Sequence, residues 1–244
     1  ATTEIYTFYS SAASDVYKRQ VLRHYLHSSN LIPTDGLVRR TAERAIGRIK
    51  DPLAQGKAIY DWVIENTSYD PAPTGIGRGD VEAMLDSGQL SGKSADIALL
   101  FVGLCRSVGI PARPVFGLRI DSSRLFAGLG AVGNLRAAQH CRAEFLSATH
   151  GWVPVDPADV RKAVLEEKLP LEDARIAALR ERLFGYWEMN WVAFNHARDF
   201  ELSPRARAPL PYLMHPYAEF GDTTLDGRDA AAFGFRIVSR EIVA

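Results

Sequence analysis

The chain has 244 residues, of which 47% are hydrophobic and 24% are charged, and its 29 basic and 29 acidic residues give zero formal net charge. This composition is typical of a globular protein and gives no support for a nucleic-acid or membrane-surface partner. No segment resembles a membrane-spanning helix or a signal peptide, and two cysteines are too few for a disulfide framework.

The first twenty residues are expected to be foreign to the protein. Residues 1–7 and 10–20 are what sequencing-library adapter and transposon-end sequences encode, so we expect residues 1–20 to be a non-native leader. A natural disordered leader is the alternative. We further expect residues 21–35 to be the remnant of a lost N-terminal region and a linker, residues 36–203 to form the core, and residues 204–244 to be a C-terminal extension that packs on it.

Two helices are predicted at the start of the core. The first follows the apolar spacing over residues 37–49, and the second begins at Asp51 with a proline in its first turn. Residues 66–80 are rich in glycine and proline and are predicted to form a loop at the border of a cleft. Asp80 is predicted to cap a short helix that follows this loop.

A third, more apolar helix is predicted over residues 97–108, because apolar residues recur there every three to four positions before Gly109 and Pro111 interrupt the pattern. Ser94 lies at the N-terminus of this helix. Unpaired backbone N–H groups and the positive end of the helix dipole favour an anion there, which makes this a good position for a nucleophile. The alternative is that Ser94 only caps the helix.

A β-hairpin is predicted downstream. After a strand over residues 115–120 and a long excursion over 121–135, residues 138–145 and 151–157 form two strands around a short polar loop. Symmetric pairing about that loop places Phe145 opposite Gly151 and His140 opposite Asp156. A carboxylate beside an imidazole fixes its tautomer and stabilises its charged form.

The remainder of the chain is predicted to be mostly structural. Helices are expected over residues 158–167 and 171–183, and a proline-rich connection over 204–216. The aromatic run 186–194 is interpreted as a strand of the core sheet, with an aromatic cleft wall as the alternative. A terminal strand is predicted over 235–238.

Four segments of the sequence together resemble the bacterial transglutaminase-like superfamily. They are Gly-Lys-Ser-Ala-Asp from Gly92, Gly-Ile-Pro-Ala-Arg from Gly109, Gln-His-Cys-Arg-Ala-Glu-Phe from Gln139, and Gly-Trp-Val-Pro-Val-Asp-Pro-Ala-Asp-Val from Gly151. The resemblance extends over residues 33–241. It implies an α+β fold with a papain-like core, in which N-terminal helices and the nucleophile helix pack on an antiparallel sheet that carries the histidine and the aspartate.

The resemblance also implies a chemistry. Members of this family perform acyl transfer with a Cys-His-Asp triad, either peptide hydrolysis or, less often, amide exchange. Matched position by position, the nucleophile is Ser94, the general base is His140 and the orienting acid is Asp156. A peptide or protein substrate and an extracytoplasmic location are implied in the same way.

Ser94 departs from the family pattern, which has cysteine at this position. A neighbouring imidazole and a helix terminus can lower the pKa of a thiol, whereas a hydroxyl must lose its proton during the reaction itself. We therefore predict at most weak hydrolase activity, and a catalytically silent module that binds peptide or glycopeptide is the alternative. Cys105 and Cys141 are predicted to be small core residues.

Three origins of Ser94 are open. They are a natural inactive or serine-using homologue, a base miscall in environmental sequence, and a deliberate Cys-to-Ser knockout. The adapter-like leader makes deliberate engineering the least favoured of the three.

Several weaker candidates complete the prediction. Gln89, five residues before Ser94, could donate a hydrogen bond to an oxyanion, although a plain loop residue is the favoured interpretation. His24 and His27 have a spacing that can bind metal, but no cysteine or acidic partner accompanies them. With no glycine-rich phosphate loop either, we predict no metal site and no cofactor.

Three arginines, Arg113, Arg119 and Arg142, have two interpretations. They could hold a substrate carboxylate, since guanidinium and carboxylate form bidentate hydrogen bonds. The favoured alternative is structural pairing with Asp96 or Glu144.

Overall fold

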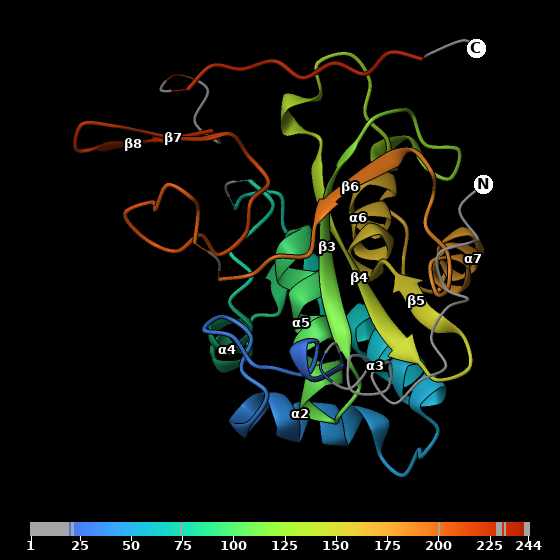
Figure 1. The fold of residues 1–244 in the computed structure, drawn as a ribbon. Helices are drawn as coiled ribbons and strands as arrows, with labels where there is room; N and C mark the ends of the chain where they lie inside the picture. Colours follow the sequence, from blue (N-terminus) through green and yellow to red (C-terminus); the bar gives the residue numbers. More distant parts are fainter. Residues whose placement is uncertain are drawn as a thin grey trace, which may run out of the picture.

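Figure 1 shows the chain as a computed structural model that describes residues 20, 22–73, 75–199, 201–227, 231 and 233–241. The leader predicted over residues 1–20 lies outside the described residues except for Gln20. None of the helices in the described part combines the length and the apolar character that crossing a membrane requires.

Three of the predicted helices precede the sheet: α2 (Gly36–Ile46), α3 (Pro52–Asn66) and α4 (Val81–Ser87). Asp51 caps α3 and Asp80 caps α4, each through a side-chain oxygen that accepts a backbone N–H of the first turn, as predicted. The first helix is shorter than predicted, because it ends at Ile46. Gly47 follows with a φ of 53°, a left-handed value that ends the helix.

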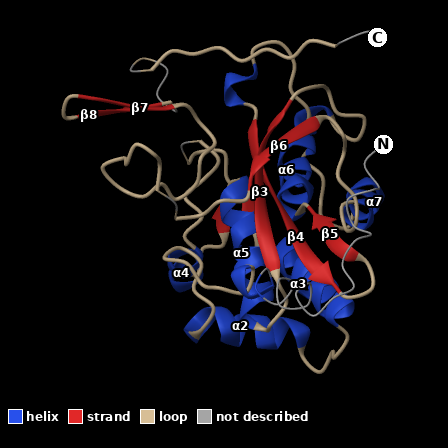
Figure 2. Cartoon of the chain, in the orientation of Figure 1, coloured by secondary structure: helices blue, strands red, loops and turns tan. Residues whose placement is uncertain are grey.

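The main sheet has four antiparallel strands in the order β5-β4-β3-β6: β3 (Ala112–Arg119), β4 (Gln139–Ser147), β5 (Gly151–Val155) and β6 (Trp191–Asn195). Helix α5 (Ser94–Ser107) packs on β3 and β4, and twelve of its 14 residues are buried. Helices α3 and α6 (Pro157–Glu167) lie beside α5 on the same face of the sheet (Figures 1 and 2). The predicted α+β fold, with helices on an antiparallel sheet, is therefore confirmed.

A pair of short strands, which the sequence patterns did not predict, joins the loop between α3 and α4 to the segment just before α5. Strand β1 (Ser68–Tyr69) pairs in parallel with β2 (Ser91–Gly92), and these short strands flank α4. The backbone N–H of Asp70 donates to the carbonyl of Gly92 at 2.9 Å. The start of α5 is thus anchored on its N-terminal side.

The register of the β4–β5 hairpin differs from the prediction. Phe145 lies opposite Val153, not opposite Gly151, because β4 continues to Ser147 and the loop is correspondingly shorter. Side chains alternate between faces with a period of two, so this shift of two residues leaves each side chain on its expected face. Asp156 lies just beyond β5, at the N-cap of α6.

The aromatic run over 186–194 is a strand only from Trp191 onward. Trp191 is buried, but Val192 and Phe194 in this edge strand are 44% and 51% exposed. The core interpretation of this run is therefore wrong for these two side chains. Residues 235–238 do not form the predicted terminal strand. The backbone N–H of Leu135 donates to the carbonyl of Ile237, and the guanidinium of Arg136 lies over the ring of Phe235.

The helices after β5 agree with the predicted order. Helix α6 is followed by α7 (Ala174–Arg182). The long excursion between β3 and β4 is irregular apart from two short 3-10 turns, η1 (Ala127–Leu129) and η2 (Leu135–Ala137). Leu129 and Leu135 are buried, so these two side chains anchor the irregular segment between β3 and β4 on the rest of the fold.

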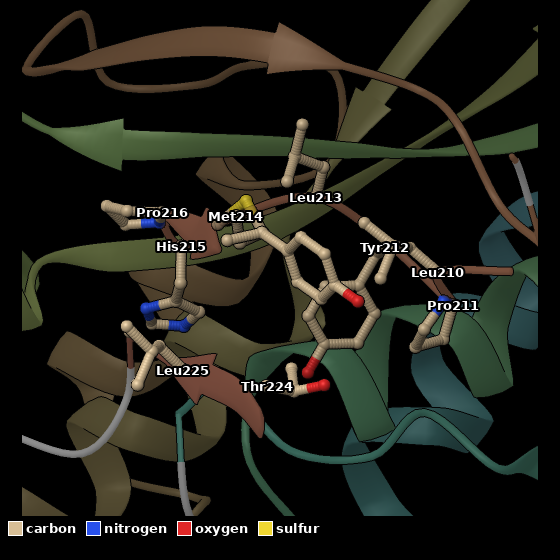
Figure 3. Close-up of a pocket in the computed structure, with 11 residues that line it drawn as sticks. Leu210, Pro211, Tyr212, Leu213, Met214, His215, Pro216, Thr224 and Leu225 are labelled. Carbon is tan, nitrogen blue, oxygen red and sulfur yellow. The ribbon is translucent and has the colours of Figure 1, made fainter. Parts of the chain in front are cut away.

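The residues after 203 form a connection and a hairpin that was not predicted, β7 (Tyr217–Phe220) with β8 (Thr223–Asp226). Tyr212 stacks on Phe116 of β3, with ring centroids 5.2 Å apart, and its hydroxyl donates to the carbonyl of Gly77 at 2.6 Å. This part of the chain contains a largely apolar cavity of about 200 Å³, and Figure 3 shows side chains that line it. None of the predicted site residues lines it.

Candidate active site

Ser94 is the first residue of α5, and the residue in the N-cap position is Lys93. The start of the helix is held by Asp96, whose carboxylate accepts three backbone N–H groups, from Lys93 at 2.9 Å, Arg78 at 2.9 Å and Gly79 at 2.7 Å. Ser94 is 2% exposed. Its side chain therefore does not serve as the N-cap, and it lies where helix N–H groups and the dipole favour negative charge.

The hydroxyl of Ser94 contacts β4. The backbone N–H of Cys141 donates to Ser94 Oγ at 3.2 Å, which places the hydroxyl next to the strand position that follows His140. Among the described residues, no hydrogen bond joins Ser94 Oγ to the His140 ring itself. Catalytic hydrogen bonds are commonly long or absent before substrate binds, so this spacing is compatible with a nucleophile and its base.

His140 and Asp156 form the hydrogen bond that the sequence predicted. His140 Nε2 lies 2.7 Å from Asp156 Oδ2, and both side chains are buried. The other carboxylate oxygen of Asp156 accepts the backbone N–H of Asp159 at 2.9 Å, which caps α6. Because Nε2 donates to a carboxylate, a neutral ring carries its proton there and leaves Nδ1 free to accept one.

A second carboxylate, Asp159, lies against the same histidine. Its Oδ1 is 3.5 Å from His140 Nε2, and its carboxylate pairs with the guanidinium of Arg119 at 2.5 Å. Sequence reasoning missed Asp159. The signal was present in the spacing of Asp156 and Asp159, three residues apart at a helix start, where both carboxylates face back toward the first turn.

Arg142 completes the charge balance. Its Nε donates to Asp156 at 3.1 Å, and its guanidinium carbon lies 4.7 Å from the ring centroid of Trp191. The ring of Trp187 lies 5.6 Å away, so part of the aromatic run covers this buried cation. Two arginines and two aspartates thus form an electrically balanced cluster around His140.

This cluster accounts for the pKa directions. Burial lowers the pKa of His140, and the charge of Arg119 lowers it further against the opposing effects of Asp159 and Asp156. Burial alone would raise the pKa of Asp159, but Arg119, together with His140, holds it well below its usual range. His140 is therefore neutral near pH 7, the form that a general base requires.

Three side chains of this cluster are of types that can bind a metal ion. One ligand atom each from His140, Asp156 and Asp159 lies within 4.8 Å of the others. Both carboxylates already pair with buried guanidiniums, from Arg142 and Arg119, so the negative charge that would hold a cation is neutralised. These residues therefore do not fit a metal ion.

Ser94 and His140 line a common cavity of about 290 Å³. Gln89 is exposed in the turn after α4 and does not line this cavity, so its role as an oxyanion donor stays a prediction. Gln139, which precedes His140, does line it. The sequence reasoning passed over Gln139, whose only signal was its place next to the histidine.

The other sequence candidates are structural. Arg113 pairs with Glu144 at 2.6 Å, as the structural interpretation predicted, and its guanidinium also lies over the ring of Trp152. The predicted partners are wrong for the other two arginines, because Arg119 pairs with Asp159 and Arg142 pairs with Asp156. The carboxylate of Asp96 accepts backbone N–H groups instead. Cys105 and Cys141 are free and fully buried, and burial raises the pKa of both thiols.

Comparison with known sequences identifies the family of this region. Residues 39–157 match the sequence profile of the transglutaminase-like superfamily. This matched segment, just under half of the chain, is similar to transglutaminase-like domains. Ser94, His140 and Asp156 all fall within the matched residues.

A relative and two of the solved structures that resemble the chain illustrate the similarity. An uncharacterised protein of Haemophilus influenzae is 41% identical over 232 residues, which are 91% of this chain and 63% of that protein; this chain thus spans less than two thirds of its relative. A candidate cysteine protease of Cytophaga hutchinsonii is 22% identical, with a TM-score of 0.44, and covers 56% of this chain and 42% of that one. The periplasmic domain of TgpA from Pseudomonas aeruginosa is 21% identical, with a TM-score of 0.46, and the match covers 61% of this chain and 51% of that one.

Proposed function

We propose that this chain is an acyl-transfer protein of the papain-like type, acting on peptide or protein amide bonds with Ser94 as the attacking group. His140 is the general base and Asp156 the orienting acid. The observation that carries the proposal is the 2.7 Å contact between His140 Nε2 and Asp156 Oδ2, made where His140 shares a cavity with Ser94. The transglutaminase-like domain supports acyl transfer as the class of chemistry.

The residues suggest the following sequence of steps. Nδ1 of His140 takes the proton of the Ser94 hydroxyl while the oxygen attacks the substrate carbonyl. The dipole at the start of α5 favours the developing oxyanion. The imidazolium then protonates the leaving amine, and water or a second amine releases the acyl group.

Serine makes this reaction slow in the present geometry. A thiolate can form before substrate arrives, whereas the hydroxyl must be deprotonated in the transition state by a correctly aligned base. Ser94 Oγ accepts a hydrogen bond from Cys141 and has none with His140, so the side chain must reorient before proton transfer. We therefore expect low turnover by the chain as it stands.

The same observation favours a second candidate function. A hydroxyl held by Cys141 and apart from the base is also compatible with a cleft that binds peptide without cleaving it. In that case the His140–Asp156 pair would be structural, as part of the buried charge cluster.

Substitution Ser94→Cys distinguishes the two candidates. If the triad is competent, a thiol-directed acylating probe should modify residue 94 of this variant, and the additional change His140→Ala should abolish the modification. Mass spectrometry of proteolytic fragments measures the site of labelling. The wild type controls for Cys105 and Cys141, whose burial makes both thiols poorly reactive.

A matched control places a new thiol elsewhere on the same helix. Ser107 is a buried serine at the far end of α5, so Ser107→Cys should not be labelled. Folded Ser94→Cys protein that stays unlabelled would contradict a working triad and favour the binding module. Hydrolysis of fluorogenic peptides by the Ser94→Cys variant that has not been treated with the probe, with the wild type far slower, would support the enzyme.

A further inference from the structure

The cavity in front of Ser94 has charged side chains of only one sign. Among its described lining residues, the charged groups are Lys93, Arg119 and Lys162, and no aspartate or glutamate lines it. Arg119 is neutralised by its ion pair with Asp159. The two lysines therefore dominate the electrostatic character of the space that a substrate would enter.

Both lysines are held in place but keep donors to spare. Lys93 Nζ donates to the carbonyl of Gly75 at 3.1 Å, and Lys162 Nζ donates to the carbonyl of Gly128 at 2.6 Å. An ammonium has three N–H donors, so each lysine has further donors available beyond this bond. Their positions are set by backbone contacts, which is the preorganisation that a binding site needs.

Nearby carboxylates neutralise these lysines incompletely. Glu166 lies 3.5 Å from Lys162 Nζ but is 40% exposed, where water weakens the interaction. Asp96 and Asp70 act on Lys93 from outside the lining, and Asp96 is occupied by three backbone N–H groups. Burial lowers the pKa of Lys93, and the positive charge of Lys162 lowers it as well. An anion between the two ammonium groups would relieve that repulsion.

An unused amide donor lies in the same lining. Gln139 Nε2 is buried and has no hydrogen-bond partner among the described residues. Buried polar groups are nearly always paired in folded proteins, so an unpaired one beside a cavity points to a ligand oxygen. Gln139 directly precedes His140, which places this donor near the reacting groups.

We propose that this cavity binds a carboxylate of the substrate, so that the protein selects acidic peptides whose carboxylate lies next to the attacked amide. Lys93 and Lys162 supply the opposite charge, and Gln139 supplies a neutral donor. The proposal rests on the proposed function for the chemistry at Ser94, but carboxylate binding itself requires no turnover. The carboxylate comes either from an acidic side chain or from a free C-terminus.

Calorimetric titration of the full chain with four matched peptides tests the proposal. One position of the peptide is Glu or Gln, and its C-terminus is free or amidated. We expect the wild type to bind at least one carboxylate-bearing peptide about tenfold more tightly than the neutral, amidated Gln peptide. Which peptide gains affinity identifies the source of the carboxylate. The preference should decrease as salt is added.

Two variants and one control locate the preference in the cavity. Lys93→Gln and Lys162→Gln should each reduce it severalfold, and either suffices if the other variant does not fold. Lys50→Gln changes an exposed lysine outside the cavity and should leave the preference unchanged. Equal wild-type affinity for all four peptides, or an unchanged preference in folded lysine variants, would overturn the proposal.

Failure of this proposal and failure of the proposed function give different results. If Ser94→Cys is labelled but no carboxylate preference is found, acyl transfer stands and the acidic substrate is wrong. If the preference is found but Ser94→Cys stays unlabelled, the cavity is an acidic-peptide binding site without a working triad.

Discussion

Substitution of Asp156 by asparagine tests the buried charge cluster most directly. The carboxylate of Asp156 has no exposed surface and receives hydrogen bonds from Arg142 at 3.1 Å, from His140 at 2.7 Å and from the backbone N–H of Asp159 at 2.9 Å. Asparagine has nearly the same shape but no charge. It therefore leaves the Arg142 guanidinium buried without its countercharge.

The expected cost follows from this geometry. Removing one partner of a buried ion pair lowers the free energy of unfolding by about 3–5 kcal/mol. Asparagine still offers an oxygen to cap α6, whereas Asp156→Ala also loses the cap and should cost about 1 kcal/mol more. Domains of ordinary stability unfold with about 5–15 kcal/mol, so the asparagine variant should fold with a much reduced margin.

Urea unfolding at neutral pH, followed by circular dichroism, measures these differences. Asp61→Asn is a matched control, because Asp61 pairs with Lys57 and Arg180 but its side chain is 26% exposed. That substitution should cost about 1 kcal/mol or less. If Asp156→Asn costs no more than the control, the carboxylate does not balance a buried charge, and the account of the cluster is wrong.

Two further predictions concern pH and packing. The pKa of His140 is lowered from 6.5 in the folded chain, so the unfolded chain binds more protons there than the folded one. The free energy of unfolding should therefore fall as the pH decreases below about 6.5, and it should level off below the pKa of the folded state. His140→Gln should flatten the pH dependence of the free energy of unfolding, measured with urea between about pH 5 and 8. An unchanged slope would contradict this prediction. The contribution of Asp159 to the free energy of unfolding is lost only at more acidic pH. Gly56→Ala should lower the melting temperature, because the new Cβ would lie 2.4 Å from the ring of Phe145. Overpacking of this kind costs about 1–3 kcal/mol, whereas the higher helix propensity of alanine contributes about 1 kcal/mol. If the clash is the cause, Gly56→Ala should lower the melting temperature less in a Phe145→Leu background than in the wild type.

Local patterns were sufficient for the helices and for the position of the candidate nucleophile. The spacing of apolar residues predicted α5, and Asp51 and Asp80 capped the helices that they were predicted to cap. These features depend on neighbours within one or two turns, which the sequence displays directly. The contact between His140 and Asp156 was also predicted, although the predicted register was wrong, because a register shift of two residues keeps each side chain on the same face.

Contacts between distant segments were not predictable in the same way. The register of the hairpin depended on where its turn closed, and the exposure of Val192 and Phe194 depended on which strand took the edge of the sheet. Neither is encoded in a local pattern, because both result from which elements pack against one another. The same holds for the cavity lining, which draws on residues from 69 to 162.

The sequence by itself determined which residue types meet at the candidate site. They are a serine at the start of a helix, a histidine on a strand, and an aspartate just after the following strand. Only the tertiary structure decided what surrounds them. Arg119, Arg142 and Asp159 belong to the cluster because a buried charge is stable only next to a charge of opposite sign. These ion pairs form only when the sheet, α6 and the loops pack against one another. Buried charge is balanced across the whole fold, whereas helix and strand patterns are read along the chain.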